Sequence, residues 1–131
     1  MIFVDTSAWF ASSVTRDTNY AIASQWLREN TEPLITTDYV VAETLTLLKA
    51  RGQAPVALSL GQQFFAGTLG RIYYLTKADL LLAWQTFRQF DDKEWSFADC
   101  TSKVVIEKLQ LTQALTFDHH FHQFGSVAIV P

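Results

Sequence analysis

The sequence of 131 residues contains a single cysteine, Cys100, so it cannot form an internal disulfide. This excludes the small secreted domains that rely on disulfides, and a lone thiol is typical of the reducing cytoplasm. Only five glycines and three prolines are present, and no segment is rich enough in either to form a linker. We therefore expect one domain over residues 1–131, long enough to bury a core without covalent support.

The sequence also lacks a convincing membrane-spanning segment and a signal peptide. Residues 52–70 carry no charge, but three glutamines and a proline interrupt the stretch. The chain reaches the carboxylate of Asp5 without the basic region that a signal peptide requires. We expect a cytoplasmic protein that has no contact with a membrane.

Positive charge is scarce. Ten Lys and Arg residues are outnumbered by thirteen Asp and Glu residues, which gives a formal net charge of −3. The strongly basic composition that would point directly to nucleic-acid binding is therefore absent. An RNA substrate is not excluded, because metal ions held by carboxylates can attract phosphates.

Short apolar runs alternate with longer segments of helical periodicity. Strands are expected at residues 2–5, 34–37, 71–75, 114–117 and 127–130. Helices are expected at residues 6–13, 19–30, 39–51, 55–67, 78–91 and 97–109. The clearest helix is 78–91, in which Leu80, Trp84, Phe87 and Phe90 fall near one face. This alternation predicts an α/β fold with a central parallel sheet flanked by helices.

Four acidic residues are placed where an open parallel sheet binds its ligands, beyond the carboxyl ends of its strands. Asp5 ends the first predicted strand and Asp118 follows the fourth. Glu43 lies in the helix after the second strand, and Asp99 lies in the first turn of the last helix. We therefore expect the four carboxylates to converge at one edge of the sheet.

Three of these acids also have a purely structural interpretation. Asp5 could cap the helix that follows it, and Asp118 could belong to a turn. Ser96 and Asp99 fit the S-x-x-D pattern of a capping box, which requires no catalysis. No single acid indicates a site, but the four acids together do.

Glu43 is the most informative of the four. Val40, Glu43 and Leu47 share a helical face through their spacing, which predicts a carboxylate within an apolar stripe. An unpaired charge there is costly, so the structural alternative is a buried ion pair with a lysine or arginine.

Three histidines follow Asp118: His119, His120 and His122. Zinc is one option for such a cluster, but three histidines within four residues cannot easily surround one tetrahedral ion. Carboxylate-rich sites suit harder cations better. We expect His119 and His122 to be solvated and His120 to reach the edge of the site or the substrate.

Four segments, in order along the chain, resemble the acidic motifs of the PIN-domain family, and specifically of its VapC-type toxin branch. They are Ile2–Trp9, Thr36–Leu45, Ser96–Cys100, and Leu115–Asp118 with Phe121 and Phe124. No acidic position departs from the family pattern, whereas residues 51–91 carry no motif. The resemblance implies a three-layer α/β/α nuclease fold, Mg²⁺ or Mn²⁺ as cofactor, and RNA as substrate. It also implies a small antitoxin protein that silences the enzyme, and a homodimer.

The predicted function is therefore metal-dependent hydrolysis of RNA phosphodiester bonds by the toxin of a toxin–antitoxin pair. Divalent ions would activate water and relieve charge on the phosphoryl oxygens. Asp5 and Asp99 are the expected direct ligands, while Glu43 and Asp118 would hold metal-bound water or a second ion. Three hydroxyl side chains are candidates for orienting these carboxylates: Thr6, Ser7 and Thr116.

Five aromatic residues offer more aromatic surface than one small core obviously requires. We expect most of them to lie in the core, and the hypothesis is that some line a groove for the antitoxin. The five are Trp9, Phe10, Trp26, Phe64 and Phe65.

Two other functions fit parts of the pattern. A phosphoacceptor receiver domain has a similar sheet, but it needs paired acids after the first strand, where Thr6 and Ser7 follow Asp5. A catalytically silent PIN-like module that only binds RNA or protein is the second alternative. The intact acidic positions argue against it.

Overall fold

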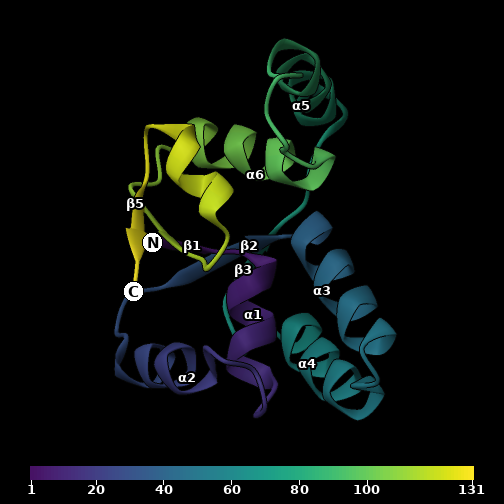
Figure 1. The fold of residues 1–131 in the computed structure, drawn as a ribbon, viewed down its shortest axis with the longest axis vertical. Helices are drawn as coiled ribbons and strands as arrows, with labels where there is room; N and C mark the ends of the chain where they lie inside the picture. The colour runs from purple at the N-terminus through teal and green to yellow at the C-terminus, as the bar shows by residue number, and fades with distance from the viewer.

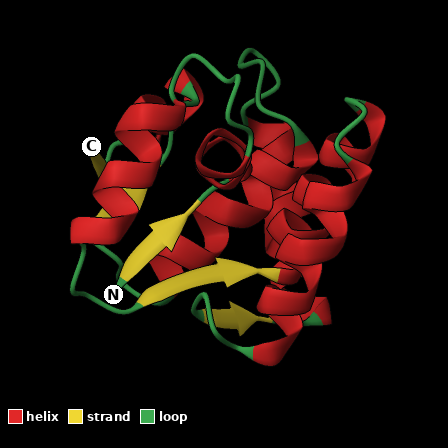
Figure 2. Cartoon of the chain, turned by 90° about the horizontal axis from the view of Figure 1, so that it is seen from below, coloured by secondary structure: helices red, strands yellow, loops and turns green.

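The computed structural model describes residues 1–131 and contains one five-stranded parallel sheet. The strands are β1 (Ile2–Val4), β2 (Leu34–Thr37), β3 (Arg71–Tyr73), β4 (Gln113–Leu115) and β5 (Ala128–Val130). Their order across the sheet is β3-β2-β1-β4-β5. The parallel α/β architecture predicted from the sequence is confirmed (Figure 2).

Six α-helices and one short 3₁₀ helix connect the strands. They are α1 (Thr6–Ser13), α2 (Tyr20–Glu29), α3 (Asp38–Ala50), α4 (Ala54–Ala66), α5 (Lys77–Gln89), α6 (Phe97–Lys108) and the 3₁₀ helix η1 (His119–Phe124). All predicted strands and helices are present with bounds shifted by at most two residues, whereas η1 was not predicted. Figure 1 shows α1 and α2 on one side of the sheet and α6 with η1 on the other.

The position of β1 at the centre of the sheet determines where a ligand can bind. The chain builds outward from β1 through β2 and β3, and later places β4 on its other side. This reversal beside β1 is a topological switch point, where the loops after neighbouring strands separate and leave a crevice. Asp5 follows β1 directly, and Asp118 lies a few residues beyond β4.

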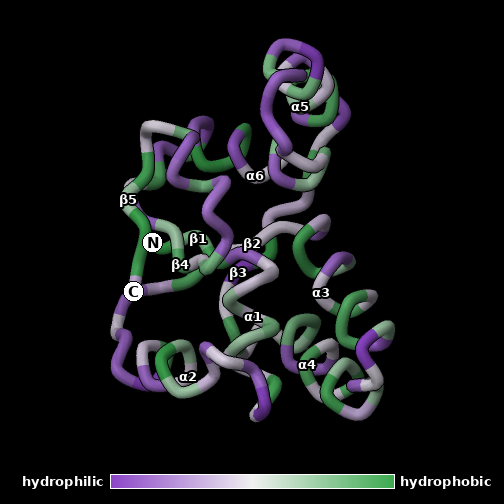
Figure 3. Tube along the Cα trace, viewed as in Figure 1, coloured by the Kyte–Doolittle hydropathy of each residue, from purple (hydrophilic) through white to green (hydrophobic).

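The three central strands β1, β2 and β4 are largely buried, as expected for a parallel sheet covered by helices. Phe3, Val4, Ile35 and Leu115 are fully buried. Phe3 pairs with Ile35 of β2 and Ala114 of β4, so the register of the central strands is fixed within the core. Figure 3, which colours each residue by its hydropathy, shows hydrophobic stretches near the labels of β1 and β4. Rigid strands therefore hold the residues that follow them.

Helix α5 projects away from the sheet and packs against α6 (Figure 1). Its predicted apolar face is only partly covered, since Trp84 is 49% exposed and Phe87 is 39% exposed. Of its residues, only Asp79 and Ala83 are buried. None of the helices, α5 included, is both long enough and apolar enough to cross a bilayer.

Candidate active site

The four acids predicted from the sequence line one pocket of about 360 Å³ beyond the carboxyl end of β1. The residues around it are Asp5, Thr6, Ser7, Glu43, Leu47, Glu94, Ser96, Asp99, Asp118 and His120. Five of them are carboxylates, and none is a lysine or arginine. This acid pocket is therefore a concentration of negative charge without a fixed cationic partner.

Asp5 is the most buried carboxylate of the pocket, with 5% of its surface exposed. It caps α1, as the structural interpretation predicted: its Oδ2 accepts a hydrogen bond from the Ser7 backbone N–H at 3.3 Å. The same oxygen accepts the hydroxyls of Ser7 at 3.0 Å and Thr116 at 3.1 Å. These three donors all bond to Oδ2, which leaves Oδ1 as the oxygen for a ligand.

The hydroxyls of Ser7 and Thr116 connect Asp5 to the loop after β4. Ser7 Oγ accepts the Phe117 N–H at 2.9 Å, and Thr116 Oγ1 accepts the Asp118 N–H at 3.0 Å. Each hydroxyl donates its single proton to Asp5 and accepts a backbone proton from the loop. Ser7 and Thr116, two of the three predicted orienting residues, thus fix Asp5 and the backbone of Asp118 relative to each other.

Burial raises the pKa of Asp5 to about 7, even though hydrogen bonds from Ser7 and the Thr6 backbone act in the opposite direction. The nearby charge of Asp118 raises it further. Desolvation and a like charge both disfavour the ionised form. A divalent cation at Oδ1 would reverse this balance, because it would favour the carboxylate.

Asp99 forms the predicted capping box at the start of α6. Ser96 Oγ accepts the Asp99 N–H at 3.0 Å, and Asp99 Oδ2 accepts the Ser96 N–H at 3.0 Å. No protein donor bonds to Oδ1. Burial raises the pKa of Asp99 despite the bond from Ser96, and the charge of Asp118 adds to the effect. The capping role is therefore correct, and it leaves one oxygen available to a ligand.

Helix α5 begins with a second capping box, formed by Thr76 and Asp79, that provides a comparison. Asp79 is buried, and it accepts hydrogen bonds from Lys108 Nζ at 2.9 Å and from the Tyr73 hydroxyl at 2.7 Å. Burial alone would raise the pKa of Asp79, but the hydrogen bonds from Thr76, Tyr73 and Lys108 hold it far below the usual range. The same motif thus has a cationic partner at Asp79, whereas no lysine or arginine neutralises Asp99.

The prediction that Glu43 lies in an apolar stripe is wrong. The buried face of α3 consists of Val40, Val41, Thr44 and Leu48, and Glu43 is exposed beside it. The predicted face and the observed one differ by one residue of helical rotation, about 100°. The alternative of a buried ion pair also fails, because no lysine or arginine lies within salt-bridge distance of Glu43.

The carboxylate of Glu43 instead borders the acid pocket, where the Thr6 hydroxyl donates to Oε1 at 2.5 Å. Thr6, the third of the predicted orienting residues, therefore holds Glu43 and not Asp5.

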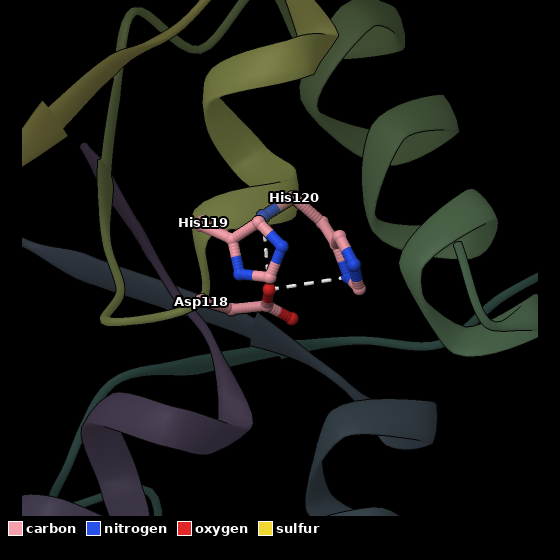
Figure 4. A group of neighbouring side chains, drawn as sticks. All are labelled: Asp118, His119 and His120. Atoms are coloured by element: carbon pink, nitrogen blue, oxygen red, sulfur yellow. Dashed lines mark hydrogen bonds and ion pairs between the residues drawn. The ribbon is translucent and has the colours of Figure 1, made fainter. Parts of the chain in front are cut away.

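Asp118 occupies the turn that was its structural alternative, where it caps η1. Its Oδ1 accepts the His120 backbone N–H at 2.9 Å. His120 Nδ1 lies 3.2 Å from this oxygen and 3.2 Å from Asp99 Oδ2. The prediction that His120 reaches the site is confirmed, and His119 and His122 are exposed as expected. Figure 4 shows the rings of His119 and His120 next to each other beside the Asp118 carboxylate.

Comparison with known proteins shows the family to which the chain belongs. The PIN domain family matches the chain over residues 2–127. This chain belongs to the PIN-domain family. The resemblance predicted from the four motifs is therefore confirmed, and the receiver-domain alternative is excluded.

The relatives within the PIN-domain family include toxins. The "23S rRNA-specific endonuclease VapC20" of Mycobacterium tuberculosis is 33% identical, over 100% of this chain and 99% of that protein. The crystal structure of that VapC20, described as a "Sarcin-Ricin loop cleaving toxin", superposes with a TM-score of 0.92 and 30% identity over both whole chains. FitAcB of Neisseria gonorrhoeae, at 19% identity and a TM-score of 0.71 over 100% of this chain and 97% of that chain, shares the fold.

Glu94 is a residue of the PIN domain's acid pocket that the sequence analysis missed. It lies in the exposed loop between α5 and α6 and borders the pocket with the four predicted acids. No strand end or helical spacing marks it. The only available signal was its position two residues before Ser96, the capping residue of α6.

The donor set of this PIN domain fits a hard divalent ion. Mg²⁺ and Mn²⁺ take oxygen ligands and retain several waters, so a few carboxylates around an open pocket suffice. Asp5 and Asp99 each have one oxygen without a protein donor, while the other oxygen is fixed by hydrogen bonds. Carboxylates that are fixed, desolvated and unpaired with lysine or arginine are the expected surroundings of a cation.

Proposed function

We propose that the acid pocket hydrolyses RNA phosphodiester bonds with divalent ions, Mg²⁺ or Mn²⁺, held by Asp5, Asp99, Glu43 and Asp118. The prediction of an endoribonuclease of the toxin class is confirmed by the family and by the full-length likeness to VapC20. The observation that supports the metal site is the pocket itself, which gathers five carboxylates without a lysine or arginine. We propose that the whole chain, residues 1–131, forms one catalytic domain.

Bound divalent ions would supply an activated water and relieve charge on the phosphate. The residues of the chain prepare the pocket for this. Ser7 and Thr116 hold Asp5 Oδ2 and leave Oδ1 directed to a ligand. The capping box holds Asp99 in the same way. These contacts come from the chain itself, and fixed side chains need little reorganisation when a phosphate binds.

The substrate that we propose is structured ribosomal RNA of the kind that VapC20 cuts, which would place the enzyme in the cytoplasm. A labelled hairpin with the sarcin–ricin sequence should be cleaved at one position in Mn²⁺ and left intact in EDTA. Cleavage of unrelated hairpins at equal rates would contradict the proposed substrate, but the proposed nuclease activity would stand. No cleavage of any RNA in Mn²⁺ would favour the catalytically silent module.

A second hollow of about 590 Å³ lies between α1, α2 and α4, away from the acids. Its walls include the apolar side chains of Trp9, Leu27, Val56 and Leu60, and Arg28 is its only charged residue. We propose that this groove binds an apolar segment of the cognate antitoxin, with an acidic side chain near Arg28. Aromatic and aliphatic pockets of this kind hold the anchor residues of peptide segments.

The aromatic residues predicted to line a groove contribute less than expected. Trp9 borders the groove, but it and Phe64 are almost fully buried and meet edge to face at 5.1 Å. Phe65 is 68% exposed and does not border the groove. The hollow therefore depends more on the aliphatic side chains of α2 and α4 than on aromatic ones.

Val56→Asp should weaken antitoxin binding about thirtyfold or more, because removing a central apolar anchor typically costs about 2 kcal/mol or more. RNA cleavage by the free enzyme should be unchanged, since Val56 lies outside the acid pocket. The matched control is Leu58→Asp, also on α4, at a residue that is 77% exposed and outside the groove. Co-expression of each variant with the cognate antitoxin, followed by copurification, measures the loss of binding. Equal losses for the two variants would place the antitoxin elsewhere.

We further propose that a second copy of the chain covers the free face of α5, which would give the predicted homodimer. Four large apolar side chains of this helix are exposed by 39–54%: Leu81, Leu82, Trp84 and Phe87. Trp84 and Phe87 are stacked with their ring centroids 6.0 Å apart. Contiguous apolar patches of this kind on a soluble protein mark interaction sites.

Trp84→Glu should convert the dimer to a monomer, because it places a charge in the centre of the apolar face. Sedimentation velocity over a range of protein concentrations measures the change. Leu58→Glu places the same charge at an exposed apolar residue of α4, outside this face, and should leave the dimer intact. A monomeric wild-type protein at every concentration would contradict the proposed interface.

A further inference from the structure

His120 is the one nitrogen donor among the residues that border the acid pocket. Its side chain is only 18% exposed. The predicted ligand set consists of carboxylates alone, so it assigns no role to this imidazole. The position of His120 is well defined, because contacts of the neighbouring residues hold the backbone on both sides of it.

Two buried aromatic residues anchor the 3₁₀ helix that carries His120. Phe121 is fully buried and Phe124 is 6% exposed. Their rings lie 4.7 Å apart, and Phe121 also faces Phe3 of the central strand β1 at 6.2 Å. At the start of the helix, the His120 backbone N–H is bound by Asp118. The core aromatics and the cap from Asp118 therefore fix the backbone that carries the imidazole.

The distances around Nδ1 fit a hydrogen bond, which Nδ1 forms with Asp99 Oδ2 at 3.2 Å, and they also fit shared ligation of one ion. Nδ1 lies 3.2 Å from both Asp99 Oδ2 and Asp118 Oδ1. Charge-assisted N–H···O bonds are shorter, about 2.7–2.9 Å. Two neighbouring ligand atoms on one ion are about 3.0 Å apart in an octahedron and about 3.3 Å apart in a tetrahedron, for metal–ligand bonds of about 2.0–2.1 Å. The observed separation falls within this range.

We propose that His120 Nδ1 is a metal ligand, together with Asp99 and Asp118, and that it makes the site prefer transition ions to Mg²⁺. This inference rests on the proposed metal-dependent function. Imidazole is a poor ligand for Mg²⁺ and a better one for the divalent transition ions, with an affinity that is smallest for Mn²⁺ and larger for Co²⁺ and Zn²⁺. The site would therefore select Mn²⁺, Co²⁺ or Zn²⁺ over Mg²⁺ of equal free concentration.

His119 is the alternative nitrogen donor. Its ring nitrogen, one Asp118 oxygen and a His120 ring nitrogen lie within 4.8 Å of one another. However, His119 is exposed and does not border the acid pocket, whereas His120 does. His122, also exposed, borders a different hollow and provides a matched control on the same helix.

The test is pulsed EPR of Mn²⁺ bound to the full-length protein, which detects a directly bound ¹⁴N nucleus without relying on activity. Wild type and His122→Asn should show nitrogen coupling, and His120→Asn should not. Calorimetry should show that His120→Asn lowers Mn²⁺ affinity relative to Mg²⁺ affinity by at least about tenfold, since loss of even an outer contact to a ligand costs about 10–100-fold. Asparagine keeps a donor near the position of Nδ1, so hydrogen bonding alone predicts no such change.

Bound Mn²⁺ without nitrogen coupling in the wild type would overturn the inference and leave the carboxylate metal site standing. Coupling that persists in His120→Asn but disappears in His119→Asn would assign the ligand to His119 and also overturn it. If neither Mn²⁺ nor Mg²⁺ binds to the wild type, the proposed function itself fails. A melting curve of each variant confirms that it is folded before the spectra are compared.

Discussion

Asp5→Asn should reduce the rate of RNA cleavage by about two to three orders of magnitude, comparable to the loss of about 3–4 kcal/mol of transition-state stabilisation. The amide oxygen can still accept the hydroxyls of Ser7 and Thr116, so the local fold should remain. What disappears is the negative charge that a hard cation requires of its ligand. Single-turnover cleavage of a labelled hairpin in saturating Mn²⁺ measures the effect.

Asp79→Asn is the matched control for this experiment. It removes the same charge from a buried aspartate, but one that is paired with Lys108 far from the pocket lining. Cleavage should be retained while the melting temperature falls, because the folded state loses a favourable ion pair. Near-normal cleavage by Asp5→Asn, with contaminating nuclease excluded, would falsify the assignment of Asp5.

The metal-free protein should become less stable by about 4 kcal/mol as the pH rises from about 4 to about 8, through Asp5 alone. The pKa of Asp5 is about 7 in the folded protein against an ordinary value of 3.8, and each unit corresponds to about 1.4 kcal/mol. Between these values the unfolded chain has lost its proton and the folded protein retains it. The folded state binds more protons, so the free energy of unfolding decreases with rising pH.

Added metal should oppose this decrease, because a cation that binds only the folded, ionised carboxylates stabilises them by mass action. At a hundredfold excess over the dissociation constant the gain is about 2.7 kcal/mol. Asp5→Asn should be more stable than the wild type in EDTA near pH 8 and should respond less to Mn²⁺. Urea unfolding of both proteins at pH 5 and pH 8, in EDTA and in Mn²⁺, measures all of these differences. A wild-type stability that changes with neither pH nor metal would mean that these acids do not form one site.

Local sequence patterns were sufficient for the secondary structure and for the place of the site. Helical periodicity and apolar runs identified every strand and α-helix, because the period of burial is a local property of the chain. The acids could be placed at one edge because the carboxyl ends of parallel strands must meet there. The 3₁₀ helix η1 was missed, since a single short segment after Asp118 has too few residues to show a period.

The exposure of Glu43 could not be read from the sequence. The spacing of Val40, Glu43 and Leu47 is compatible with an apolar stripe. In the structure, however, α3 is oriented so that Thr44 and Leu48 face the interior. The orientation of α3 is set by its contacts with the neighbouring helix α4 and with α1 and α6, which are distant in sequence. Glu94 was missed for a similar reason, because only the packing of the neighbouring elements brings its loop to the pocket.

The two capping boxes show most clearly what the sequence determined and what it did not. Thr76 with Asp79 and Ser96 with Asp99 are the same motif, and each was sufficient by itself to start a helix. Only the tertiary structure decides that Asp79 meets Lys108, whereas Asp99 faces Asp118 and His120. Because the free energy of a buried carboxylate depends on the charges that surround it in space, the same local pattern yields a structural ion pair at one position and a candidate metal ligand at the other.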